Sequence, residues 1–135
     1  MSQLTFTLND GNKIPFLAFG TGTSFVRKDV TEPVSLAVEK GFTHLDCAQV
    51  RAYGIDWSFS VFTVGIQSYQ NEDTLGAAIK ASGKPRELFF ITTKLSSALE
   101  PGDTVSDALR KSLSRLGLGA FQSIPFHIRT AETPR

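Results

Sequence analysis

The sequence has very little cysteine: among its 135 residues, Cys47 is the only one. One thiol can form neither an internal disulfide nor a cysteine-based zinc cage, so disulfide-rich scaffolds and zinc-ribbon domains are excluded. The sequence also lacks an N-terminal basic segment followed by an apolar core, and no apolar run approaches the about 20 residues of a membrane helix. We therefore expect a cytoplasmic protein with no membrane partner.

An excess of charge of either sign is absent as well. Lys and Arg number 14 and Asp and Glu 13, which gives a formal net charge of +1, so no nucleic-acid partner is expected. His44 and His127 are the two histidines and form no ligand cluster with the single cysteine, so no metal is expected. A content of 41% hydrophobic and 20% charged residues is typical of a globular chain, and the length suits one domain.

The patterns that are present predict alternating strands and helices. Residues 4–8, a turn at 9–12 and residues 13–20 predict a short hairpin that leads into a buried strand. Further strands are expected over 42–46 and 87–95, and helices over 29–41, 71–83 and 102–117. This alternation favours a parallel sheet built from βα units.

Each predicted helix has an expected boundary or buried face. Asp29 or Thr31 is expected to cap the first helix, which ends before Gly41, and Asn71 to cap the second. Helical spacing places three apolar residues of the first helix on one face: Val34, Leu36 and Ala37. The third helix is expected to bury Val105, Ala108, Leu109, Ser112, Leu113 and Leu116.

The spacing of the strands indicates an insertion. Predicted strands begin near residues 16, 42 and 88, so the steps are 26 and 46 residues. Removing the 18 apolar, aromatic-rich residues 51–68 shortens the second step to 28, and the repeat becomes regular. Residues 119–135 form a divergent tail in which a fourth strand is due but, with Pro125, is weak at best.

Three polar residues are expected at one end of the sheet. Asp46 ends one predicted strand, Lys94 ends the next, and Tyr69 precedes the helix between them. Reactive side chains in βα architectures gather at the carboxyl ends of parallel strands, and a phenol beside a cation is a tunable proton donor for a carbonyl oxygen. The alternatives are a turn-capping Asp, a solvated Lys and a packing Tyr.

Five segments in order resemble the N-terminal half of the aldo-keto reductases, over about residues 4–50 and 69–118. They are IPFLAFGTGT, GFTHLDCAQV, YQNEDTLG, ELFFITTKL and VSDALRKSLSRLGL. The resemblance implies an α/β fold, namely a partial TIM (β/α) barrel that comprises the N-terminal half and is preceded by a short β-hairpin. Residues 1–135 would then form a single incomplete barrel domain.

The resemblance also implies a reaction: reduction of a small aldehyde or ketone with NADPH. By motif, the catalytic tetrad corresponds to Asp46, Tyr69, Lys94 and His127, and the cofactor-binding residues to Gly20, Thr21 and Asp46. Tyr53 is nearer to Asp46 in sequence, but no Asn-Glu pair follows it. His127 stands at the expected distance from Leu118, although its neighbours differ from the family pattern.

Two interpretations of the departures stay open. Residues 51–68 are either translated intervening sequence, with a frame change in the tail, or a genuine loop insertion that would displace Tyr69. Two functions follow: a carbonyl reductase whose activity is impaired in these 135 residues, or an inactive half barrel that self-associates through its open sheet edge. A ligand- or protein-binding half barrel is a third possibility, which no feature of the sequence favours.

Overall fold

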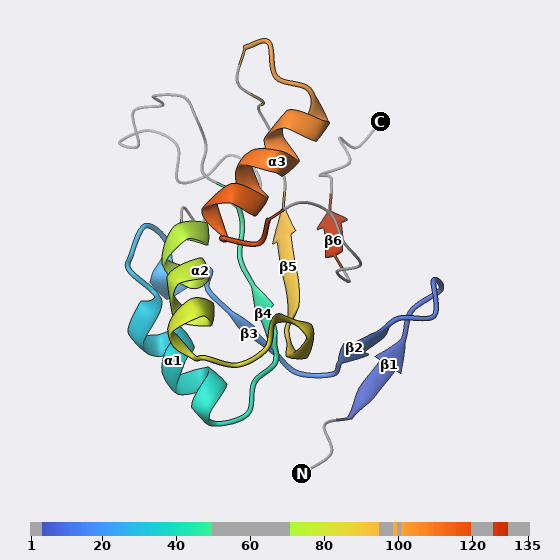
Figure 1. Ribbon diagram of the computed structural model, residues 1–135, viewed down its shortest axis with the longest axis vertical. Coiled ribbons are helices and arrows are strands. Elements are labelled where there is room, and N and C mark those ends of the chain that lie inside the picture. Colours follow the sequence, from blue (N-terminus) through green and yellow to red (C-terminus); the bar gives the residue numbers. More distant parts are fainter. Residues whose placement is uncertain (1–3, 50–70, 95–98, 100, 120–125, 130–135) are drawn as a thin grey trace.

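The computed structural model describes residues 4–49, 71–94, 99, 101–119 and 126–129, the last four by their backbone (Figure 1). The predicted insertion 51–68 and most of the tail 119–135 lie outside the described residues. The elements in chain order are β1 (Thr5–Thr7), β2 (Lys13–Pro15), β3 (Ala18–Gly20), the 3₁₀ helix η1 (Thr23–Phe25), α1 (Thr31–Glu39), β4 (His44–Asp46), α2 (Glu72–Ala81), the 3₁₀ helix η2 (Arg86–Leu88), β5 (Phe90–Lys94), α3 (Val105–Arg115) and β6 (Phe126–Arg129).

Two sheets organise these elements. Strands β1 and β2 pair antiparallel as the predicted hairpin, and β3, β4, β5 and β6 form a parallel sheet in that order. Within the described residues the parallel sheet has two open edges and does not close into a barrel. The weak fourth strand expected in the tail is a four-residue strand that pairs with β5.

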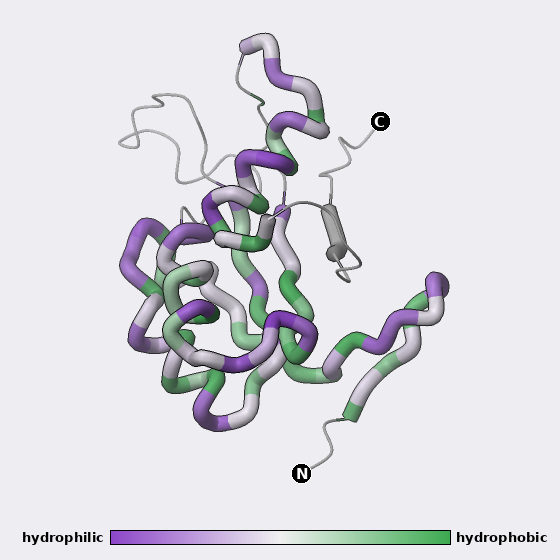
Figure 2. The backbone as a smooth tube through the Cα atoms, in the orientation of Figure 1, coloured by the Kyte–Doolittle hydropathy of each residue, from purple (hydrophilic) through white to green (hydrophobic). Residues whose placement is uncertain are grey.

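Helices α1, α2 and α3 lie against one face of the parallel sheet, and the hairpin projects away from it (Figure 1). The core lies between this face and the helices, and hydrophobic residues stand within β4 and at the start of β5, to the right of α2 (Figure 2). Its buried members are Val30, Val34, Val38, Leu45, Cys47, Leu75, Ala78, Ile79, Phe89, Ile91 and Leu116. Successive residues of a strand face opposite sides of a sheet. Leu45 and Ile91 therefore face the helices, and their neighbours in sequence face away.

Some packing expectations are wrong. Residues 13–20 divide into β2 and β3, and β3 is an edge strand with Ala18 and Gly20 exposed rather than a buried strand. Leu36 and Val105 are 53% and 51% exposed, because the first faces away from the sheet and the second opens α3 beyond the core. Val38 takes the buried place in α1.

The helix boundaries match the expectations more closely than the caps do. Helix α1 ends before Gly41, whose φ of +96° suits a glycine that stops a helix. Its N-cap position is Val30, although the Asp29 carboxylate accepts a hydrogen bond of 2.7 Å from the Thr31 backbone N–H. Asn71 occupies the N-cap position of α2, but its side chain bonds elsewhere. In the described part of the chain, none of the helices is long and apolar enough to cross a membrane.

Candidate active site

The carboxyl ends of β4 and β5 bring the predicted polar residues together. In the parallel ladder, Asp46 stands opposite Thr92, and Lys94 is two residues further along β5. Because side chains alternate along a strand, Asp46, Thr92 and Lys94 share the face of the sheet that points away from the helices. The candidate site therefore lies on the side of the sheet that would be the inside of a barrel.

Asp46 and Lys94 form an ion pair at this edge. The Lys94 Nζ lies 2.5 Å from the Asp46 Oδ1 and donates a second hydrogen bond of 3.2 Å to the Cys47 carbonyl. The side chains are 14% exposed for Lys94 and 25% for Asp46. Such a pair is less screened by water than a surface salt bridge and is held by two acceptors. The predicted meeting of this carboxylate and this ammonium is confirmed.

His44 lies one step below this pair on the same face. Its Nε2 is 2.9 Å from the Thr92 hydroxyl, its Nδ1 is 3.2 Å from the Pro15 carbonyl, and its ring meets the Phe90 ring edge-on at 5.0 Å. Burial lowers the pKa of His44 below its usual 6.5. The ring is therefore neutral at pH 7 and adds no second positive charge beside Lys94.

The loop after β3 closes the other side of Asp46. Gly20 stands opposite Asp46 in the ladder, and Thr21 donates both its backbone N–H and its hydroxyl to the Asp46 carbonyl, each at 2.9 Å. A Cβ added at Gly20 would meet no atom of the described residues within 4 Å, so among these residues the backbone beside Asp46 borders open space. The Thr21 side chain is fully buried, so it holds this loop in place from the interior of the protein.

Asn71 fastens the start of α2 to the same loop. Its amide donates to the Thr21 carbonyl at 2.8 Å and to the Phe25 carbonyl at 3.3 Å, and its oxygen accepts from the Thr21 hydroxyl at 3.1 Å. All of these partners belong to the β3–η1 segment, which explains why the side chain does not cap its own helix. The asparagine of the Tyr-x-Asn-Glu motif thus serves as a bracket between α2 and the strand end next to Asp46.

Glu72 fastens the same helix start to β5 and α3. This carboxylate is fully buried, and it accepts one hydrogen bond from the Thr93 hydroxyl and one from Arg115 Nε, both at 2.7 Å. Sequence reasoning assigned no role to Glu72, because its cationic partner lies 43 residues away. The feature of the sequence that could have indicated this buried role is a charged residue in the first turn of a helix whose other residues at helical spacing are apolar.

The remaining predicted residues stand as follows. Tyr69 lies outside the described residues, two positions before Asn71. The backbone of His127 is part of β6 and stands opposite Thr92, two residues short of the level of Lys94. Cys47 is fully buried, and burial raises the pKa of its thiol, so it is no nucleophile. Among the described side chains, no group of three or more His, Cys, Asp or Glu is placed to hold a metal ion.

Comparison with known proteins places this arrangement in a family. The model of the aldo/keto reductase family matches residues 16–135, a range that includes the divergent tail. The aldehyde reductase YPR1 of Saccharomyces cerevisiae is 41% identical over 117 residues, which are 87% of this chain and 31% of the yeast protein. An aldo-keto reductase of Mycobacterium sp. (strain MCS) is 38% identical over 112 residues, or 83% of this chain and 33% of its own length.

Solved structures agree with the sequence match. The Bombyx mori aldo-keto reductase AKR2E4, crystallised in complex with NADP, superposes with a TM-score of 0.64 at 34% identity and covers 87% of this chain and 36% of its own. The aldo/keto reductase of Brucella melitensis gives a TM-score of 0.59 at 29% identity, with 86% of this chain and 38% of its own covered. The chain thus spans about a third of the length of the curated relatives it matches. These matches, together with four parallel strands and an Asp-Lys pair at their carboxyl ends, show that the chain belongs to the aldo-keto reductase family.

Proposed function

We propose that the protein to which these residues belong reduces small aldehydes or ketones to alcohols with NADPH. The observation that carries the proposal is the ion pair between Asp46 and Lys94 at the ends of two adjacent parallel strands. A fixed cation at this place favours the ionised form of a neighbouring phenol and lowers a pKa that starts near ~10. Tyr69 is the phenol that the motif supplies.

The roles proposed for Asp46, Tyr69, Lys94 and His127 are those that the family resemblance implies. Asp46 holds the Lys94 ammonium, and Tyr69 donates its proton to the carbonyl oxygen as that oxygen gains negative charge. Tyr69 precedes Asn71 by two residues in the sequence, and Asn71 is bonded to the loop after β3. His127 of β6 orients the carbonyl.

NADPH, when bound, supplies the hydride that the carbonyl carbon receives. One feature of the described residues is compatible with a bound NADPH: the backbone at Gly20 borders open space beside Asp46. Thr21 keeps this stretch of backbone in place through its two hydrogen bonds to the Asp46 carbonyl. The family resemblance implies that the nicotinamide end of the cofactor would lie against the loop after β3, and the open space at Gly20 is compatible with this placement.

The test supplies the missing part of the barrel from a relative. Residues 1–118, with and without 51–68, replace the matching segment of the yeast aldehyde reductase YPR1, and NADPH oxidation with an aldehyde is followed by absorbance. We expect turnover by the chimera that lacks 51–68, and none by residues 1–135 alone. Turnover by residues 1–135 would contradict the predicted impairment, and an inactive chimera that folds would contradict the reductase assignment.

Matched variants in the active chimera identify the proton donor. Tyr69→Phe is expected to lower kcat by about a hundredfold or more, as for loss of a general acid. Lys94→Met is expected to lower kcat in the same way. Lys111→Met, which removes a cation of α3 bound to Asp103, is the control and is expected to leave kcat unchanged. An unchanged kcat for Tyr69→Phe would remove Tyr69 from the mechanism.

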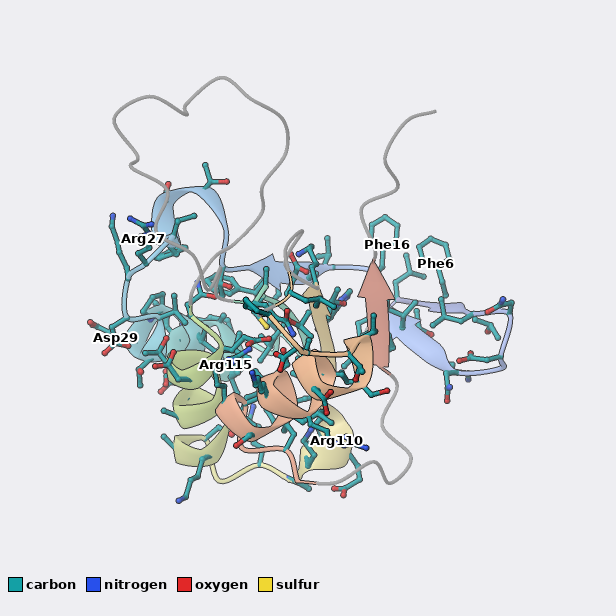
Figure 3. The ribbon with its side chains drawn as sticks, turned by 90° about the horizontal axis from the view of Figure 1, so that it is seen from above. Phe6, Phe16, Arg27, Asp29, Arg110 and Arg115 are labelled. Atoms are coloured by element: carbon teal, nitrogen blue, oxygen red, sulfur yellow. The ribbon has the colours of Figure 1, made fainter. Side chains whose placement is uncertain are left out.

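A second candidate is self-association of residues 1–135. It is favoured by the hairpin patch, defined as Leu4, Phe6, Phe16 and Leu17, whose side chains are each more than half exposed. The rings of Phe6 and Phe16 lie together at the hairpin (Figure 3), and Phe16 precedes the exposed edge strand β3 by two residues. An apolar surface that continues into an unpaired strand edge is suited to pairing with a second copy.

Light scattering across a range of protein concentrations tests this candidate. We expect a mass that rises with concentration, and a lower mass for Phe16→Ser at each concentration. A mass that stays monomeric throughout would contradict self-association.

A further inference from the structure

A cavity of about 470 Å³ lies between α2, the turn that leads into η2, and the end of α3. This volume falls within the range of pockets that bind small ligands. Its charged lining residues are all basic: Lys80, Lys84, Arg86 and Arg115. The other lining residues are Gly, Ala, Leu and Ile, so the described wall of the cavity contains no carboxylate.

Little of this positive charge is neutralised by the described residues. Arg115 pairs with the buried carboxylate of Glu72. Lys84 donates to the Val38 carbonyl at 2.8 Å, which provides an acceptor but no negative charge. Glu87, the chain neighbour of Arg86, is exposed and acts on the guanidinium through its charge without a hydrogen bond. The cavity therefore keeps an excess of positive charge.

Arg86 is the residue whose hydrogen bonds are incomplete. Its Nη1 donates to the Phe89 carbonyl at 2.5 Å, whereas its Nε and Nη2 are shielded from solvent and have no acceptor in the part of the chain that the structure describes. Burial of the side chain also lowers the pKa of the guanidinium. A buried donor without an acceptor is unfavourable, most of all on a charged group.

The two unsatisfied atoms form a recognition edge. Nε–H and Nη2–H point in the same direction along one side of the guanidinium, the arrangement that binds two oxygens of one phosphate or carboxylate. Both atoms are shielded in the present conformation, so binding an anion in the cavity requires the Arg86 side chain to turn toward it. An anion in the cavity would supply the two missing acceptors and neutralise the excess charge.

We propose that this cavity is a binding site for a phosphate group, with Arg86 as its bidentate anchor and Lys80 and Lys84 as supporting charges. A phosphate dianion matches both the fork of Arg86 and the charge of several cations. The site is separate from the Asp46–Lys94 pair, because α2 and α3 cover the opposite face of the sheet. It is therefore distinct from the proposed cofactor site and does not depend on the proposed reductase activity.

Isothermal titration of residues 1–135 with inorganic phosphate, at constant ionic strength set with chloride, tests the proposal. We expect saturable binding of one phosphate per chain. Loss of a bidentate charged contact in Arg86→Met is expected to weaken binding about tenfold or more. Lys80→Met, which changes an exposed side chain of the cavity wall, is expected to weaken binding to a smaller extent and keeps the test valid if Arg86→Met does not fold.

Arg110→Met is the matched control, because it also removes one positive charge. Its side chain is 72% exposed and lies on the side of α3 away from Arg115 (Figure 3). Binding by Arg110→Met is expected to equal that of the unmodified chain. Absence of saturable phosphate binding, or equal weakening by Arg110→Met and Lys80→Met, would overturn the proposal.

Two sources of the phosphate group are distinguished by a second titration with glycerol 3-phosphate. If this phosphomonoester binds more tightly than inorganic phosphate, the site recognises the phosphate of an organic ligand that also fills the cavity. If the two bind equally, the site recognises free phosphate. Either result supports the phosphate site, provided that Lys80→Met weakens the binding of the titrated phosphate compound.

Discussion

The start of α2 and the hairpin patch differ in how far their side chains are buried and paired. At the start of α2, Asn71 and Glu72 are fully buried, and both oxygens of Glu72 accept hydrogen bonds. At the hairpin patch, large apolar side chains are more than half exposed beside an edge strand. At the start of α2, described residues of this chain supply the hydrogen-bond partners of the buried side chains. The hairpin patch instead presents an apolar surface that a further element would cover.

This difference separates contacts that the described residues complete from surfaces that the described residues leave exposed. The polar brackets and the Asp46–Lys94 pair join β3, β4, β5, α2 and α3, all of which lie within these residues. The exposed surfaces lie where a four-stranded parallel sheet opens at its edge. The described residues thus form the Asp46–Lys94 pair and the contacts that support it, while the edges of the parallel sheet stay open among these residues.

Replacing Glu72 by Ala tests the start of α2 and has the largest expected effect apart from the core control Phe89→Ala described below. The change leaves the Thr93 hydroxyl and the Arg115 guanidinium without their buried acceptor. We expect the free energy of unfolding to fall by about 3 kcal/mol, the lower end of the range for breaking a buried pair, because Arg115 is partly exposed. Urea denaturation followed by circular dichroism measures it.

Asp73→Ala is the control for Glu72→Ala. Asp73 belongs to the same first turn of α2 but is exposed, so its removal is expected to change the free energy of unfolding by no more than about 0.5 kcal/mol. Equal losses for the two variants would mean that charge near the helix start matters and the buried contacts do not.

Replacing Gly76 by Ala tests the contact between α2 and α3 and is second in size. The added Cβ would lie 2.6 Å from the Leu116 carbonyl oxygen, so the backbone after α3 must move. We expect a net loss of about 1–3 kcal/mol in unfolding free energy, as for overpacking, despite the about 1 kcal/mol that Ala gains over Gly within a helix. Denaturant titration measures it.

Ala77→Gly makes the reverse change at an exposed neighbouring position. It is expected to lose about 1 kcal/mol of unfolding free energy through helix propensity alone. If Gly76→Ala instead raised the stability of the chain, the close approach of α2 to Leu116 would be wrong.

The sequence predicted the elements and the meeting of Asp46 with Lys94, because these depend on local periodicity and on the rule that parallel strands end at one edge. It did not predict the exposure of Leu36 or Val105, since helical spacing defines a face but not whether another element covers it. The exposure of β3 was missed for the same reason: the apolar residues suit a barrel interior, and the described strands form an open sheet.

The brackets at Asn71 and Glu72 were beyond sequence reasoning for a different reason. Asn71 was expected to cap α2, and in sequence nothing distinguishes a capping asparagine from one that bonds a loop 46–50 residues earlier. The partner of Glu72 in α3 is equally remote. Such contacts follow from tertiary packing, which turns a residue suited to a helix start into a link between elements.

His44 offers a third, smaller test on the polar face of the sheet. Its folded-state pKa is lowered by burial, so the unfolded chain binds the proton more readily. The contribution of His44 to stability is therefore complete above the unfolded-state pKa near ~6.5 and is lost progressively as pH falls below it. Unfolding free energy should decline from pH 7 to 5, and His44→Gln should flatten this decline.

Proton NMR measures the same pKa directly. In His127→Gln, His44 is the one remaining histidine, so its ring signals are unambiguous. A titration midpoint below 6.5 is expected from the direction of the shift. A midpoint above 6.5 would show that the surroundings of the ring are more negative than its contacts with Thr92 and Pro15 indicate.

Replacing Phe16 by Ser tests the open region and has the smallest expected effect on folding. Because Phe16 is 52% exposed and lies outside the core, the free energy of unfolding of the monomer should change by about 0.5 kcal/mol or less. The matched deletion, Phe89→Ala, removes a ring that is 2% exposed and should cost about 3–5 kcal/mol. Dilute-solution denaturation compares the two variants, and a similar loss for both would mean that the hairpin patch is part of the core of this chain instead of a surface left for another element.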